Sequence, residues 1–123
     1  MAARLTRLNS VAGKIFFRVG ALSGASAVLI AAHGAHSFKT NVDDPYRHQV
    51  FDVAKFYHFT TSLALLAVPL CGQPFIAGTL LASSIPLFSG TCYVHALYDI
   101  DELRKYTPHG GVLLVAGWAA LAL

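Results

Sequence analysis

The length of the stretches without a charged side chain is the feature that most constrains this chain. Val19 to Phe38 is a run of 20 such residues between Arg18 and Lys39. At about 1.5 Å of rise per residue, a helix of this length extends about 30 Å, the thickness of the hydrocarbon core of a bilayer. The run therefore predicts one membrane-spanning helix.

Two further runs lack charged side chains. Phe56 to Tyr98 has 43 residues, too many for one span, and is interrupted near Gly72 and Pro74. Because glycine gives backbone freedom and proline suits the first turn of a helix, this interruption predicts a hairpin between two spans. The last run, Tyr106 to Leu123, has 18 residues and predicts a fourth span.

Local signals set the bounds of the helices. Phe56 to Leu70 alone would cover only about 22 Å, so the second helix must begin earlier. Asp44 followed by Pro45 is a typical helix start, with a capping carboxylate before a proline, and Thr107 before Pro108 is another. The predicted helices are Val19 to Phe38, Pro45 to Leu70, Pro74 to Tyr98 and Thr107 to Leu123.

Composition supports a membrane protein with a single domain. Hydrophobic residues make up 55% of the 123 residues and charged residues only 12%, about half the share usual in soluble domains. We therefore predict an all-α integral membrane protein, a four-helix antiparallel bundle with an N-terminal amphipathic helix. Residues 1–18 form the basic amphipathic segment and residues 19–123 the transmembrane domain.

The distribution of charge predicts the orientation of the bundle. The segment before the first span carries four basic side chains and no acidic one, whereas the two longer connections between spans balance basic with acidic residues. By the positive-inside rule, both termini and the short hairpin face the inside. The four basic residues are Arg4, Arg7, Lys14 and Arg18.

These basic residues share one face of a helix, beside a face of apolar residues. A basic, serine-containing segment without acidic residues resembles a mitochondrial targeting segment, which predicts the inner membrane with both termini in the matrix. The alternative is an ordinary interfacial helix anchored on anionic lipid. The predicted partners are the lipid bilayer and other membrane protein subunits, and no nucleic acid.

Small residues indicate where the helices pack. Membrane helices approach one another through small side chains, because no hydrophobic effect drives them together in lipid. Gly20 and Gly24 form a GxxxG pattern on the first span. Pro69 and Pro86 predict kinks. The predicted helix-packing residues are Gly20, Gly24, Gly78, Ala82, Gly90, Gly110, Gly111 and Gly117.

All six histidines fall toward the outer side of the predicted topology. An interfacial belt of polar aromatic side chains is the simpler interpretation, and a polar site within the spans is the sharper one. The sequence has neither a metal-binding HExxH motif nor an acidic residue within a span. We therefore predict no catalytic residues, no metal site and no cofactor.

Several short motifs also occur in a familiar order. They are Gly20-Ala-Leu-Ser-Gly24, His33-Gly-Ala-His36, Tyr57-His58 followed by Ser62-Leu-Ala-Leu-Leu66, Leu87-Phe-Ser-Gly90 with Tyr93, and Pro108-His-Gly-Gly111 leading to Gly117-Trp118. In these motifs the chain, over roughly Val19 to Leu123, resembles the transmembrane protein 256 family and its bacterial relatives, small membrane proteins of unknown function. The resemblance implies the fold and topology but no reaction.

The resemblance and the residues together select His36 and His58. If the first two spans are antiparallel neighbours, His36 at the end of one lies near His58 at the beginning of the next. A neutral imidazole there needs a hydrogen-bond partner, and Thr61 and Ser62 are close along the helix. We therefore predict a structural polar clamp of His36, His58, Thr61 and Ser62. The family pattern has a second histidine where this chain has Thr61.

Three functions remain as hypotheses. The first is a structural or accessory subunit of an inner-membrane assembly such as a respiratory-chain complex, which the glycine-rich helix faces favour. The second is a small carrier, channel or cofactor-binding protein that uses the outer-side histidines. An enzyme is the third, although the sequence offers no pair of nucleophile and base.

Overall fold

The first long helix begins where Ser10 caps it. In the computed structural model, which describes residues 10–123, the Ser10 hydroxyl accepts a 3.0 Å hydrogen bond from the backbone N–H of Gly13. Helix α2 (Val11–His33) follows and continues through a π-helical turn (Gly34–Phe38) into α3 (Lys39–Asn41). The helix thus starts eight residues before the predicted Val19, because charged side chains are compatible with a helix once a cap starts it.

The predicted basic segment 1–18 is therefore described only in part. Residues 1–9 lie outside the described residues, and residues 11–18 form the first two turns of α2.

The second long helix begins at the predicted residue. The Asp44 carboxylate accepts a 3.0 Å hydrogen bond from the Tyr46 N–H, and Pro45 occupies the first position of α4 (Pro45–Ala67). A 3-10 turn (Val68–Leu70) that contains Pro69 ends the helix. The predicted range Pro45 to Leu70 is confirmed.

The third helix follows the hairpin at residues 71–73. It consists of α5 (Pro74–Ser84), a π-helical turn (Ile85–Gly90) and α6 (Thr91–Tyr98). Pro86 lies in the π-helical turn, because a residue without an N–H cannot continue the regular hydrogen-bond ladder. The helix stops at Asp99, whose φ of 57° lies in the left-handed region. The predicted range Pro74 to Tyr98 is also confirmed.

The fourth helix is shorter than predicted. A 3-10 turn (Glu102–Tyr106) precedes α7 (Thr107–Ala120), whose 14 residues extend only about 21 Å. Among the described residues, three helices are long and apolar enough to cross a membrane: Val11–Asn41, Pro45–Leu70 and Pro74–Tyr98. The predicted all-α membrane bundle of four helices is confirmed, and the predicted range Thr107 to Leu123 is corrected at its end, because α7 stops at Ala120.

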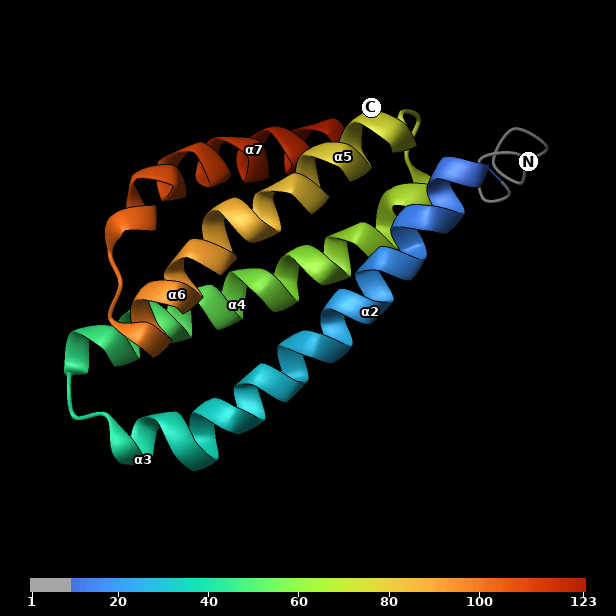
Figure 1. Cartoon of the computed structure of the whole chain (residues 1–123). Coiled ribbons are helices and arrows are strands. Elements are labelled where there is room, and N and C mark those ends of the chain that lie inside the picture. Colours follow the sequence, from blue (N-terminus) through green and yellow to red (C-terminus); the bar gives the residue numbers. More distant parts are fainter. Residues whose placement is uncertain (1–9) are drawn as a thin grey trace.

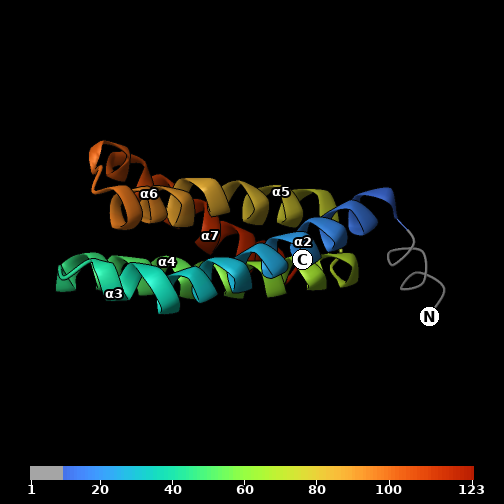
Figure 2. The ribbon, with the colours of Figure 1, turned by 60° about the horizontal axis from the view of Figure 1, so that its bottom comes forward.

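The four helices form an antiparallel bundle (Figure 1). Helix α2 lies along α4, and α7 lies along α5. Figure 2 shows α5 and α6 in line with each other above α2 and α4. The hairpin and the C-terminus lie at one end of the bundle, called the hairpin end here, and the loops at residues 42–44 and 99–101 lie at the other, called the loop end.

Two apolar clusters form the core. The cluster at the hairpin end joins α4, α5 and α7, and comprises Ala64, Leu65, Val68, Cys71, Ala77, Leu81, Leu114 and Ala120. The cluster at the loop end joins the end of the first helix to α4 and α6, and comprises Phe38, Val50, Phe51, Ala54, Cys92 and Ala96. Between them, polar side chains lie buried among the helices.

Candidate functional site

A buried polar site that joins several helices is centred on His58. Its side chain is only 5% exposed and lies in the middle of α4, between α2 and α6. Its Nδ1 lies 2.9 Å from the Tyr93 hydroxyl of α6, and its Nε2 lies 3.0 Å from the Ser23 hydroxyl of α2. One imidazole therefore connects three helices.

Two serines complete this network and determine the direction of its hydrogen bonds. Ser62 donates to the backbone carbonyl of His58 at 2.8 Å, which uses its single proton. In the 2.7 Å contact between Ser23 and Ser62, Ser23 must therefore be the donor. Ser26 likewise donates to the carbonyl of Ser23 at 2.7 Å, and its hydroxyl lies 3.4 Å from Nε2.

The protons of the remaining partners follow from this order. Because Ser23 has given its proton to Ser62, it accepts from Nε2–H of His58. Nδ1 is then the acceptor and Tyr93 the donor. The hydrogen-bond network thus assigns a neutral His58 protonated on Nε2. Both ring nitrogens are used to hold helices together.

The structure corrects the predicted pairing of His36 with His58. His36 is exposed on the π-helical turn, whereas His58 is buried beside Ser23. The prediction counted His58 as the beginning of the membrane-embedded part of the second helix, although the helix itself was predicted to begin at Pro45. His58 in fact lies about 20 Å along α4 from Pro45. That depth corresponds to the middle of α2 and not to its end.

The other two predicted clamp residues lie on α4. Ser62 belongs to the His58 network. Thr61 is buried but is not among the hydrogen-bonding partners of His58 in the described part of the chain.

The predicted packing glycines differ in how closely a neighbour approaches. A Cβ added at Gly20 would lie 2.7 Å from Leu65 Cβ, whereas one at Gly24 would lie 3.7 Å from Ser62 Cβ. Added Cβ atoms would also come within 3 Å of another helix at Gly78, Gly110 and Gly117.

Of the remaining three predicted packing residues, the two glycines have more room. A Cβ added at Gly111 would lie 3.8 Å from the Phe88 ring, and the nearest neighbours of one added at Gly90 belong to its own helix. Ala82 is half-buried against the hairpin-end cluster.

Sequence reasoning missed Ser23, Ser26 and Tyr93 as site residues. The two serines are three residues apart inside a charge-free run, and polar side chains in a span need partners, which is a usable signal. Tyr93 gives no such signal, because a tyrosine near the end of a span also fits an interfacial belt.

Sequence reasoning also missed a stripe of small residues that are spaced seven apart. Gly13, Gly20, Ala27 and Gly34 are buried on α2 at intervals of seven, the spacing of a coiled-coil contact. A Cβ on Gly34 would lie 2.3 Å from the ring of Phe51.

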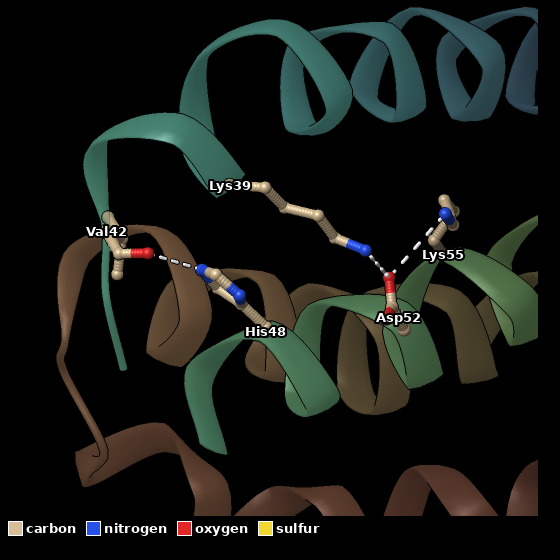
Figure 3. Close-up of polar contacts among 5 residues, drawn as sticks. All are labelled: Lys39, Val42, His48, Asp52 and Lys55. Atoms are coloured by element: carbon tan, nitrogen blue, oxygen red, sulfur yellow. Dashed lines mark hydrogen bonds and ion pairs between the residues drawn. The ribbon is translucent and has the colours of Figure 1, made fainter. Parts of the chain in front are cut away.

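The loop end carries a second group of polar contacts (Figure 3). Lys39 and Lys55 both approach one carboxylate oxygen of Asp52, at 2.8 and 3.6 Å. The imidazole of His48 contacts the backbone carbonyl of Val42, which ties the loop to α4. No group of three histidine, cysteine or acidic side chains among residues 10–123 is placed to hold a metal ion.

Comparison with known proteins identifies the family. The model of the family described as "Protein of unknown function (DUF423)" matches residues 30–111. The chain belongs to this DUF423 family. The match includes His58 and Tyr93 and begins after Ser23 and Ser26. This family has relatives in bacteria and in a eukaryote, so the match is consistent with the resemblance to the transmembrane protein 256 family.

DUF423 relatives are similar over most of their length. A UPF0382 membrane protein of Staphylococcus aureus is 36% identical over 115 residues, which cover 89% of this chain and 93% of the relative. One of Bacillus subtilis is 32% identical, with 89% and 94% covered. One of Schizosaccharomyces pombe is 35% identical, with 85% and 96% covered. No solved structure matches the chain.

Proposed function

We propose that this DUF423 protein is a structural or accessory subunit of a larger membrane assembly. The His58 network carries the proposal, because both nitrogens of its buried imidazole are bonded within the chain and join α2, α4 and α6. Neither nitrogen is left to bind a ligand or to transfer a proton to a substrate. The function that this geometry supports best is the maintenance of a fixed helical arrangement.

The outward faces of α2 are available to neighbours. Only 11% of the residues in its most apolar stretch are buried within the chain, compared with 44% and 39% for the other two long helices. Its buried residues form a narrow stripe of small side chains, and this stripe approaches α4 closely at Gly20. Lipid solvates an apolar face as well as a protein does, so the partner must be sought by experiment.

For location we propose the mitochondrial inner membrane, with both termini in the matrix and a respiratory-chain complex as the assembly. The support is the basic segment without acidic residues, which precedes the first charge-free run. The bacterial relatives mean that the family as a whole is not confined to mitochondria. Protease protection of a C-terminal epitope in intact mitochondria and in mitoplasts tests both the location and the orientation.

Gentle purification from the native membrane tests the function. We expect the tagged chain to migrate with other membrane subunits at a constant ratio on native gels and in size exclusion. The exposed variant His36→Leu, expressed at the same level, should recover the same partners and controls for handling. A folded chain that migrates alone at its own size would contradict the proposal.

One observation favours the second candidate, a cofactor-binding or carrier protein. Nδ1 of His95 is buried without a hydrogen-bond partner among the described residues, and its ring meets the edge of Tyr46. An absorption spectrum and a metal analysis of the same preparation test this candidate. A coloured or metal-containing preparation that loses the bound group in His95→Gln would favour it over the accessory role.

A further inference from the structure

A groove on the outer surface of α2 and α4 has the features of a lipid site. Its volume is about 410 Å³. Small side chains of α2 line one wall, with Ala27 and Ala31 leaving the space open, and the aromatic rings of Phe56 and Phe59 line the other. Both rings are substantially exposed, so the groove opens toward the surroundings of the bundle.

One end of this groove is cationic. Lys55 lines the groove, and Figure 3 shows Lys39 reaching from α3 toward the same carboxylate, that of Asp52. Two ammonium groups thus share one carboxylate oxygen, at 2.8 and 3.6 Å, which leaves one positive charge in excess. Each lysine side chain is 38% exposed, so both can donate hydrogen bonds to a further anion.

We propose that the groove binds one anionic phospholipid, with its phosphate on Lys39 and Lys55 and an acyl chain between α2 and α4. Along α4 the groove extends from Lys55 toward Thr60, away from the loop end. The charged head would therefore lie toward the loop end and the chain toward the centre of the bundle, as in a bilayer leaflet. A lipid with no net charge should bind more weakly, because its head group is attracted less by the excess positive charge of the two lysines. This inference does not depend on the accessory role.

Native mass spectrometry of the delipidated full-length protein tests the proposal. Phosphatidylglycerol and phosphatidylcholine with identical oleoyl chains would be titrated separately. We expect one retained phosphatidylglycerol per chain, bound about tenfold more tightly than phosphatidylcholine. Lys55→Gln should remove most of this preference, and Ala31→Phe, which fills the groove, should weaken both lipids.

Matched variants distinguish the groove from general effects. Lys105→Gln removes the same charge at an exposed site outside the groove, and Ala119→Phe adds the same ring on the exposed side of α7. Both should bind lipid like the parent, and melting curves confirm that each variant is folded. Equal retention of the two lipids, equal losses in Lys105→Gln and Lys55→Gln, displacement by millimolar inorganic phosphate alone, or a dimer that excludes lipid would each overturn the proposal.

Discussion

Tyr93 donates to Nδ1 of His58 from another helix, so removal of its hydroxyl leaves a buried acceptor without a partner. Tyr93→Phe keeps the ring and its contacts with Phe51 and His58. We expect the free energy of unfolding to fall by about 1–3 kcal/mol. Equilibrium unfolding in mixed micelles measures the change, with the exposed Tyr98→Phe as control. A variant as stable as the parent would contradict the hydrogen bond between Tyr93 and His58.

The two histidines of the predicted clamp should respond differently to leucine. His58→Leu leaves the Tyr93 hydroxyl without its acceptor inside the bundle, which should cost about 1–3 kcal/mol. Ser23 loses the hydrogen bond that it accepts from His58 but still donates to Ser62. His36→Leu alters an exposed side chain and should change stability by less than about 0.5 kcal/mol. Melting temperatures of both variants in the same detergent provide the test. Equal losses of stability in the two variants would instead support the predicted pairing of His36 with His58.

Among the helices, α2 and α4 approach each other closely at Gly20. An added methyl group there would meet Leu65 Cβ at 2.7 Å and the carbonyl oxygen of Ser62 at 2.8 Å, so α2 would have to move. We expect Gly20→Ala to cost about 1–3 kcal/mol. Gly24→Ala meets only an ordinary contact at 3.7 Å and should be neutral or slightly stabilising. The free energies of unfolding of the two variants show whether the small residues spaced seven apart, which include Gly20, determine the contact between α2 and α4. A greater loss of stability in Gly24→Ala would argue against it.

Adjacent glycines of α7 offer a similar comparison. A Cβ at Gly110 would lie 2.4 Å from the backbone nitrogen of Phe88, in the π-helical turn, whereas one at Gly111 would lie 3.8 Å from the Phe88 ring. Gly110→Ala should therefore destabilise the bundle by about 1–3 kcal/mol, since backbone cannot rotate away. Gly111→Ala should be tolerated. Thermal unfolding of the two variants measures this, and equal stability would mean that α7 is not fixed at this point.

For the whole molecule, the bundle places the first loop and the hairpin at opposite ends. Asn41 lies at the loop end and Gln73 in the hairpin. In a chain whose own cysteines, Cys71 and Cys92, are replaced by alanine, Asn41→Cys and Gln73→Cys should react with an impermeant thiol reagent from opposite sides of the membrane. Labelling of both from one side would exclude this topology.

Much of the helical arrangement could be predicted from local signals. The capping carboxylate of Asp44 and the prolines at positions 45 and 74 set the starts of two helices, because their effect extends over only a few residues. The length of the charge-free runs indicated membrane helices without reference to any partner. The start of α2 was misplaced because the last basic residue of a segment marks no helix boundary, whereas the cap at Ser10 does.

The candidate site could be predicted only in part, because its partners are distant in the sequence. His58 and Ser62 share a helix face, and that much follows from their spacing of four. Their meeting with Ser23 and Tyr93, each 35 residues from His58, depends on how far two helices slide past one another. Contacts of small residues such as Gly20 determine that register, and they exist only after the helices pack. The sequence by itself therefore determined which segments are helical, and the tertiary structure alone decided which polar groups meet, since a hydrogen bond requires atoms within about 3 Å.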